Sequence, residues 1–205
     1  MCLRRLRWLF VVAVFLFART AKADNVVYVD GTYAFADNGN GIPPYGGTLN
    51  GQSTQFYCVD FAHDITGGMS WSVTITSLTA PASSFATGPT FLKSQMEYLE
   101  MAWLVTKMMG TSNTGLQAEY QYAIWSFTGG PNPYGTNASL VAKALAAVNA
   151  GFTGQGFEIL TPTGSIGQEF LIYVMEPSET LMLGIGLIVL AVFLRKNHVV
   201  LSSRN

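Results

Sequence analysis

The chain has 205 residues, of which 11 are Lys or Arg and 12 are Asp or Glu, and its formal net charge is −1. This near neutrality hides an uneven distribution, because the basic residues are concentrated at the two ends of the chain. Between Asp24 and Glu176 there are 11 acidic residues and only 3 lysines, a net charge of −8. A region this acidic lacks the positive surface that binds nucleic acids or anionic lipids, so we exclude both as partners.

The first 23 residues predict an export signal. Three arginines lie within the first seven residues, an apolar run follows at residues 9–18, and Ala21-Lys22-Ala23 matches an A-x-A cleavage site. The apolar run is well short of the ~20 residues that an uncleaved membrane span needs. We therefore expect cleavage between Ala23 and Asp24, which leaves a single exported domain at residues 24–174.

The other end of the chain predicts a short transmembrane helix. Residues 181–194 are apolar without interruption, and Arg195 and Lys196 follow at once. A helix of this length is roughly 21 Å long, which is short for a bilayer span. The run has no polar face, however, and the paired cations would hold its end in the cytoplasm. We expect residues 197–205 to form a cytoplasmic tail.

The sequence before this helix carries a sorting motif. The order of Met175-Glu176-Pro177-Ser178, a short apolar helix and a basic pair resembles the PEP-CTERM tail that bacterial exosortases recognise, and the resemblance covers residues 175–196. It implies an exosortase-like processing enzyme, an intermediate anchored in the inner membrane, and a final place at the cell surface or in the extracellular matrix. The motif departs from the usual pattern at Met175, where a proline is common, and in the nine residues that follow Lys196.

Strand and helix patterns in residues 24–174 predict an α+β domain with an antiparallel sandwich or barrel-like sheet and about three inserted helices. Apolar and polar residues alternate from Ser70 to Leu78, which is typical of a half-buried strand. Further strands are expected at residues 25–28, 55–61, 157–160 and 169–174. Residues 38–51 are rich in Gly, Pro and Asn and predict a long loop. Helices are expected at residues 90–109, 116–127 and 139–149.

The first predicted helix has a regular apolar spacing. Four residues at intervals of 4, 3 and 4 predict its buried face: Leu92, Met96, Leu99 and Trp103. Glu97 and Glu100 fall on the other side and predict a solvated face.

Cys58 is the only cysteine that remains after Cys2 leaves with the signal. Exported cysteines normally pair, and Cys58 has no partner in its own chain. Three ordinary interpretations are open: a small buried hydrophobic residue, an intermolecular disulfide, or a reactive thiol. A fourth is an internal thioester with Gln121.

The residues around both groups favour the thioester. Tyr57-Cys58-Val59-Asp60 and Gln121-Tyr122-Ala123-Ile124-Trp125 resemble the two signatures of bacterial thioester domains, and the resemblance extends over about residues 55–127. It implies that the Cys58 sulfur displaces ammonia from the Gln121 amide, and that an amine of a surface or matrix partner attacks the product. A protein of this kind is an adhesion molecule that binds covalently, not an enzyme, and it needs no cofactor.

A thioester requires a dry site that holds sulfur close to the amide carbon. The residues expected around it are Tyr57, Asp60, His63, Tyr120, Tyr122 and Trp125. Trp125 follows Gln121 by one helical turn and shares its face, and tyrosine hydroxyls could donate to the carbonyl oxygen. Tyr120 stands where thioester domains often have Thr.

His63 is the only histidine of the exported domain. It could orient or protonate the leaving thiolate, and a purely structural role is the simpler interpretation. One histidine and one cysteine do not make a zinc site, so no metal is expected.

Two other functions stay open. One is a surface or matrix interaction module in which Cys58 is free and aromatic residues bind glycan or protein without a covalent bond. The other is a hydrolase that uses Cys58 with His63; a Gly-x-Ser-x-Gly elbow for a serine hydrolase is missing from the sequence. Asn137 begins a glycosylation sequon, for which a helix cap is the expected role.

Overall fold

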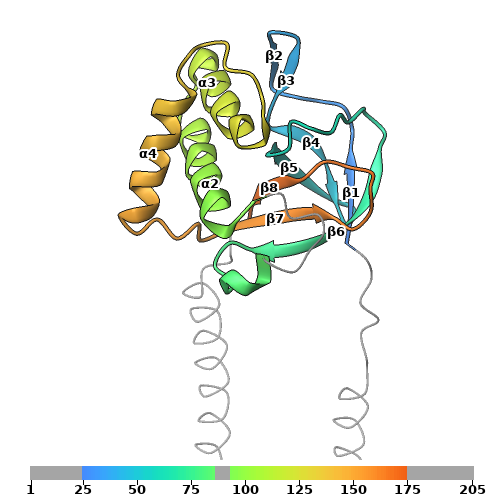
Figure 1. The fold of residues 1–205 in the computed structure, drawn as a ribbon. Coiled ribbons are helices and arrows are strands. Elements are labelled where there is room, and N and C mark those ends of the chain that lie inside the picture. Colours follow the sequence, from blue (N-terminus) through green and yellow to red (C-terminus); the bar gives the residue numbers. More distant parts are fainter. Residues whose placement is uncertain (1–24, 86–92, 175–205) are drawn as a thin grey trace, which may run out of the picture.

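The computed structural model describes residues 25–85 and 93–174 (Figure 1). The expected cleavage site at Ala23 and Asp24, the sorting motif from Met175 to Ser178 and the apolar segment before Arg195 lie outside these residues. Within the described part of the chain, no helix is long and apolar enough to cross a bilayer.

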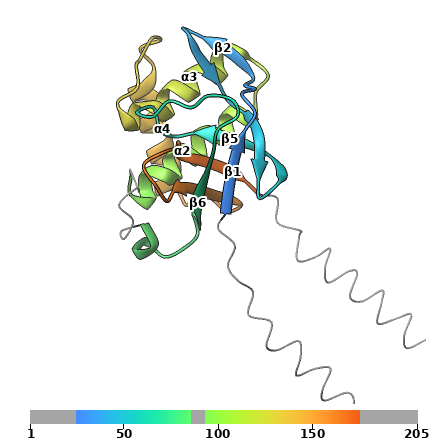
Figure 2. The same cartoon turned by 90° about the vertical axis from the view of Figure 1, so that its right-hand side faces the viewer.

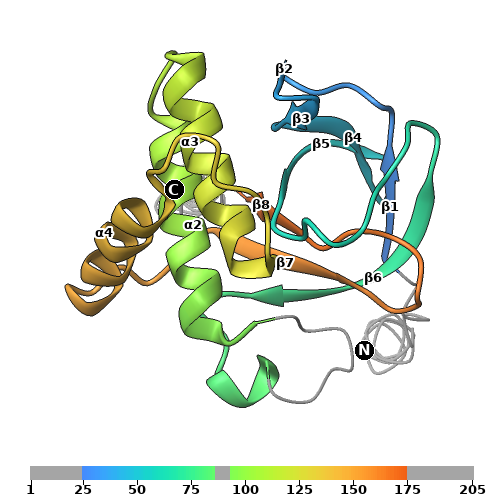
Figure 3. The same ribbon diagram turned by 45° about the horizontal axis from the view of Figure 1, so that its top comes forward.

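Six antiparallel strands close into a barrel in the order β1-β4-β5-β8-β7-β6, and β2 and β3 form a separate hairpin. The strands are β1 Asn25–Val29, β2 Phe35–Asp37, β3 Asn40–Ile42, β4 Tyr45–Leu49, β5 Gln52–Cys58, β6 Ser70–Ser77, β7 Phe157–Pro162 and β8 Phe170–Tyr173. The ring of strands is visible end-on in Figure 3. Strands β1 and β6 pair on the side of the barrel that faces away from the helices (Figure 2).

The three α-helices of the described residues lie on one side of the barrel (Figures 1 and 3). They are α2 Gln95–Met109, α3 Thr114–Trp125 and α4 Asn137–Asn149, with short 3₁₀ turns at η1 Ala82–Phe85 and η2 Ser126–Thr128. A capping box between Ser94 and Glu97 starts α2, and the Asn113 side chain accepts the Leu116 N–H to start α3. The predicted α+β domain, with about three helices and a barrel-like antiparallel sheet, is confirmed.

The strands divide the apolar residues between two cores, because successive side chains point to opposite faces. On β5, Phe56 and Cys58 point into the barrel, whereas Tyr57 faces the helices. The paired strand β8 follows the same alternation, since Cys58 lies opposite Phe170 and Tyr57 lies opposite Leu171. The second core is therefore a layer between the barrel wall and the three helices.

Helix α3 contributes to both cores. Its Ala123 and Ile124 pack in the layer between barrel and helices. Its Ala118, Tyr122 and Trp125 pack with the inward residues of the barrel. The helix therefore lies against the barrel at the end of β5, and this position brings Gln121 to Cys58.

The expected loop at residues 38–51 is wrong. It contains β3 and β4, and β4 pairs with β1 on one side and with β5 on the other. The glycines that suggested a loop serve close strand packing, since a Cβ at Gly47 would lie 2.0 Å from the Tyr28 carbonyl oxygen.

The expected faces of α2 are wrong in part. Leu99 and Trp103 pack against the core as expected, and Leu92 lies outside the described residues. Met96 is 50% exposed, while Glu100 is only 6% exposed. The buried positions include Tyr98, Met101 and Val105. Because α2 packs against both the barrel and the other two helices, apolar residues lie around most of its circumference. The predicted spacing therefore does not follow the buried face throughout. The expected cap at Asn137 is wrong as well, because Thr136 is the N-cap residue of α4 and Asn137 donates to the Tyr122 carbonyl oxygen at 3.0 Å.

Candidate functional site

Cys58 is the last residue of β5, and its side chain lies inside the barrel with no exposed surface. The Trp125 Nε1–H donates to its sulfur at 3.2 Å, and the thiol donates to the Asp60 carbonyl oxygen at 3.2 Å. Burial raises the pKa of Cys58 to about 12, although both hydrogen bonds act in the opposite direction. The free thiol therefore stays protonated at neutral pH.

Gln121 meets Cys58 from α3 and is also fully buried. Its Nε2 donates to the Cys58 carbonyl oxygen at 2.8 Å, across a separation of 63 residues. Since the partner is a carbonyl oxygen, this bond fixes which end of the amide faces Cys58. The other end, Oε1, is buried and has no hydrogen-bond partner among the described residues. A buried acceptor without a donor costs roughly 1–3 kcal/mol, so the fold holds this amide in an unfavourable setting.

Thr128 ties the segment after Cys58 to the end of α3. Its Oγ1 accepts the Phe61 N–H at 3.0 Å and lies within hydrogen-bond distance of the Val59 and Trp125 carbonyl oxygens, at 3.3 and 3.1 Å. Gly130 permits the tight turn that follows, because a Cβ there would lie 2.5 Å from the Trp125 Cβ. The backbone that carries this indole is thus held by Thr128 and by the turn at Gly130.

The structure separates the six residues expected around the cross-link. Trp125 and Asp60 contact the sulfur, as described above. Tyr57 and Tyr120 belong to the core between barrel and helices, on the other side of the barrel wall from the Cys58 side chain. The Tyr122 hydroxyl donates to the Asp37 carbonyl oxygen at 2.9 Å. The expected tyrosine donor to Gln121 Oε1 is therefore wrong for the described residues.

His63 lies at the surface rather than at the sulfur. Its side chain is 52% exposed, and its Nδ1 lies 2.6 Å from Asp60 Oδ2. That aspartate also accepts the Ala62 N–H at 2.9 Å. His63 therefore orders the loop after β5, and its link to Cys58 runs only through Asp60.

Gln168 is a site residue that the sequence pattern did not indicate. It is 7% exposed, and its Nε2 donates to the carbonyl oxygens of Asp60, at 2.7 Å, and His63. Its Oε1 has no hydrogen-bond partner among the described residues. It lies in the turn before β8, and neither its type nor its neighbours predict a buried position, because its partners come from a loop more than 100 residues earlier.

A cavity of about 640 Å³ opens beside this site. Aromatic side chains from four segments line it: Tyr33, Tyr45, Phe61 and Trp125. Polar lining residues include Asp64 and Gln168, and no lysine or arginine lines it. The cavity also borders β3, so it lies at the barrel end that carries the β2–β3 hairpin (Figure 1).

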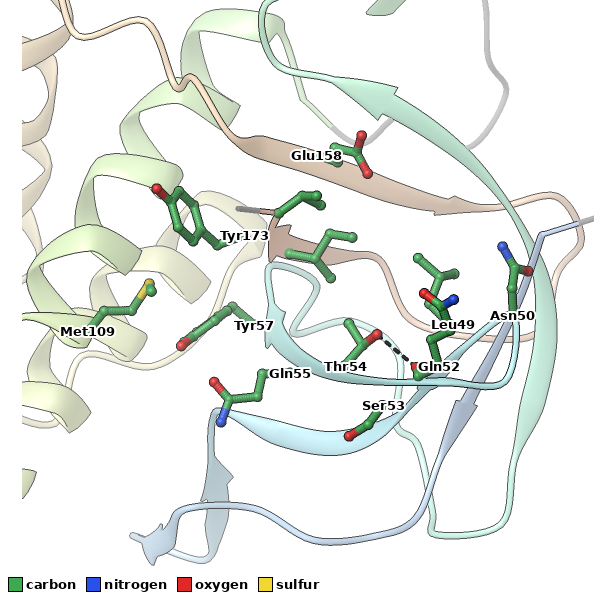
Figure 4. Close-up of a pocket in the computed structure, with 12 residues that line it drawn as sticks. Leu49, Asn50, Gln52, Ser53, Thr54, Gln55, Tyr57, Met109, Glu158 and Tyr173 are labelled. Atoms are coloured by element: carbon green, nitrogen blue, oxygen red, sulfur yellow. Dashed lines mark hydrogen bonds between the residues drawn. The ribbon is translucent and has the colours of Figure 1, made fainter. Parts of the chain in front are cut away.

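A second cavity, of about 670 Å³, is lined by other residues of the strands. Figure 4 shows its lining from β5, β7 and β8, with Met109 of α2 at one end. Its nearest approach to Cys58 along the chain is Tyr57, whose side chain points away from the sulfur to the other core. Trp125 and Asp60, which contact the sulfur, do not line this cavity.

One further polar group is buried nearby. Glu169 is 1% exposed, and its carboxylate accepts the Tyr98 hydroxyl at 2.5 Å and the Thr161 hydroxyl at 2.6 Å. Burial raises the pKa of Glu169 to about 7, although both hydroxyls oppose the rise. The residue joins α2, β7 and the start of β8.

No group of three or more metal-ligating side chains occurs in the part of the chain that the structure describes. No family model, curated protein or solved structure matches the chain. The function must therefore be inferred from the chemistry of the site.

Proposed function

We propose that this chain is an exported surface or matrix protein in which Cys58 and Gln121 form an internal thioester that attaches covalently to an amine-bearing partner. One observation carries the proposal. Two fully buried side chains from segments 63 residues apart meet so that the Gln121 amide lies against the Cys58 backbone. The bacterial thioester-domain signatures around both residues support the same interpretation.

Formation of the thioester is an acyl transfer within the chain. The Cys58 sulfur attacks the Gln121 Cδ, an S–C bond forms, the C–N bond breaks, and the thiol proton leaves with the amide nitrogen as ammonia. The site suits this step because both groups are already held together and bulk water is excluded. The Trp125 N–H supports negative charge on the sulfur as the thiol loses its proton.

The loss of the thiol proton leaves the Asp60 carbonyl oxygen with a donor. The Asp60 carbonyl oxygen accepts both the Cys58 thiol and the Gln168 Nε2, at 3.2 and 2.7 Å. When the thiol proton has gone, the Gln168 bond remains. A thioester therefore strands no acceptor at Asp60, and Gln168 supports the product of the reaction.

In the capture of a partner, the Cys58 sulfur is the leaving group. A neutral primary amine attacks the thioester carbonyl, a C–N bond forms, the S–C bond breaks, and a proton passes from the amine to the Cys58 sulfur. The result is an amide bond between Gln121 and the partner. The reaction happens once per molecule, so the protein is a covalent binder and not an enzyme.

The test is the intact mass of the chain purified after export, beside Cys58→Ala and Gln121→Ala variants. We expect wild type alone to be lighter by one ammonia than its sequence mass, and methylamine to add at Gln121 while one thiol appears. A freshly prepared wild type at full sequence mass, with a titratable thiol, would overturn the proposal.

The same cavity supports a second candidate function. Four aromatic side chains line its wall, and such walls bind glycan rings or protein side chains without a covalent bond. In that case Cys58 is a free buried thiol, and Cys58→Ala leaves partner binding intact. Under the thioester proposal the same variant abolishes capture.

The surface location has a separate test. We propose that an exosortase-like enzyme processes the tail at the Met175-Glu176-Pro177-Ser178 motif, after the Arg195 and Lys196 pair has held the chain in the inner membrane. Replacing Glu176 and Pro177 with alanine should leave a larger, membrane-retained form on a gel of cell fractions. A surface form of unchanged size would count against sorting.

A further inference from the structure

The aromatic-lined cavity lies beside the residues that contact the Cys58 sulfur. Trp125 lines the cavity and donates to Cys58 Sγ at 3.2 Å. Gln168 lines it and shares with Cys58 the same acceptor, the Asp60 carbonyl oxygen. Tyr45 also lines it, and the pKa of Tyr45 is raised first by burial and then by its proximity to Cys58. Three lining residues from three segments thus lie near one sulfur atom, which does not itself line the cavity.

One residue of the cavity wall, Gln168, has a buried acceptor that lacks a donor. The Gln168 Nε2 bonds two carbonyl oxygens, so the amide orientation is fixed and the oxygen is the end left over. This Oε1 is buried and has no partner among the described residues. Buried polar atoms are nearly always paired, so an orphaned acceptor in a cavity wall indicates a place for a donor from a ligand.

The rest of the lining suits an alkylamine. Aromatic faces accommodate the apolar stem of a lysine and attract its ammonium group. Asp64 stands exposed among the lining residues and supplies a negative charge. The described domain has three lysines, Lys93, Lys107 and Lys143, and none of them lines the cavity to repel a cation.

We propose that this cavity admits a lysine side chain of the partner, and that Gln168 Oε1 binds its amine before the amine attacks Gln121. The proposal rests on the thioester proposed above. It adds the route by which the partner's amine enters and the residue that determines specificity. The ammonium loses one proton to water at the open side of the cavity. The neutral amine then forms the C–N bond as the S–C bond breaks, and a second proton passes to the sulfur.

The test compares two tryptophan variants of the full chain. Ala62→Trp fills the aromatic-lined cavity, and Ser53→Trp places a side chain of the same size at the second cavity, shown in Figure 4. Both positions are exposed. The measured quantity is the rate at which intact mass shifts on addition of Nα-acetyl-lysine methylamide. We expect Ala62→Trp to slow uptake by about tenfold or more, and Ser53→Trp to change it by less than about twofold.

A Gln168→Leu variant tests the acceptor itself. Because Gln168 also orders the loop at Asp60 and His63, the variant is judged by the ratio of uptake of the lysine probe to spontaneous hydrolysis of the thioester in buffer. Loss of amine binding lowers this ratio, by about fivefold for one hydrogen bond of ~1 kcal/mol. A merely loosened structure admits water and amine alike, so an unchanged ratio would overturn the role of Gln168.

The outcomes separate the two proposals. A wild type of full sequence mass overturns the thioester and the entry site together. A wild type lighter by one ammonia, whose Ala62→Trp and Ser53→Trp variants react with the lysine probe at equal rates, overturns the entry site alone. Slow uptake in Ala62→Trp only, with a lowered ratio in Gln168→Leu, supports the assignment.

Discussion

Two buried polar groups lie near the β5–β8 pairing, and they differ in how completely they are satisfied. On the helix side, the Glu169 carboxylate accepts hydroxyl protons from Tyr98 and Thr161. At the end of β5, the Gln121 amide bonds to Cys58 through its nitrogen only, and its oxygen has no donor among the described residues. Similar burial thus serves different ends: a closed network fixes elements in place, whereas an incomplete one leaves a group available for chemistry.

The two groups also differ in what they join. Glu169 connects α2 with β7 and β8 through bonds that need no further reaction. Cys58 and Gln121 connect β5 with α3, and only a covalent bond would make that connection permanent. The two groups can therefore be tested separately, by removing the proposed covalent link at Cys58 and the titrating carboxyl group at Glu169.

Opening the proposed thioester should have the largest effect. Methylamine treatment would remove this cross-link without a mutation, and the loop that the cross-link would close spans 63 residues. The chain-entropy relation for cross-links predicts a loss of about 4 kcal/mol in the free energy of unfolding. Urea denaturation of treated and untreated wild type measures it, with methylamine-treated Gln121→Ala as the control that should not change. Equal midpoints for treated and untreated wild type would mean that the bond does not staple the fold.

Replacing Glu169 with glutamine should change the pH dependence of stability. Burial raises the pKa of this carboxyl from 4.5 to about 7, so the folded state favours the protonated form. Its contribution is complete below pH ~4.5 and is lost as pH rises through about 7. Glutamine keeps a neutral side chain at all pH values, so wild type should lose on the order of 3 kcal/mol relative to Glu169→Gln between these limits.

The check is chemical denaturation of both chains from pH 5 to pH 8. Glu119→Gln on α3 serves as a matched control and should follow the wild-type curve. Parallel curves for wild type and Glu169→Gln would show that the buried carboxyl titrates normally.

Removing the indole N–H should affect the reactive site only. Trp125→Phe keeps an aromatic ring beside the sulfur but deletes the donor at 3.2 Å. Since that donor supports the leaving thiolate, the rate of amine uptake should fall by about fivefold, the effect of ~1 kcal/mol. Trp103→Phe, on the helix face where Lys107 Nζ lies 4.8 Å from the ring centroid, should leave the rate unchanged. Equal rates in both variants would remove Trp125 from the chemistry.

Features that depend on neighbouring residues could be predicted from the sequence. Local patterns located most strands and all three described helices, because alternation and helical spacing are properties of neighbouring residues. The pairing of Cys58 with Gln121 followed from two motifs, and the structure brings the two residues together at the position these motifs indicated. Strands β3 and β4 were not predicted. Gly46 and Gly47 are typical of loops, and only their pairing with β1 and β5 identifies them as strand residues.

The rest depends on contacts between distant segments. Gln168 and Glu169 are adjacent, yet one turns to the loop after β5 and the other to α2. Glu100 carries a charge that normally marks solvent, but α2 is enclosed on several sides. The sequence did not identify a donor to Gln121 Oε1, because the hydroxyl of the nearby Tyr122 donates to the Asp37 carbonyl oxygen instead.

His63 should have the smallest effect and thereby marks the limit of the reactive site. Its ring is half exposed and pairs with the buried Asp60, and solvent screening at the ring keeps the contribution of the pair small, on the order of 1 kcal/mol. If the site ends at Asp60, His63→Gln changes the rate of methylamine uptake by less than about twofold and leaves the pH profile of uptake unaltered. Asp60→Asn is the matched comparison, because it disturbs the loop whose Asp60 carbonyl oxygen accepts the Cys58 thiol. A loss of uptake in His63→Gln with Asp60→Asn unaffected would instead make the histidine the proton donor to the departing sulfur.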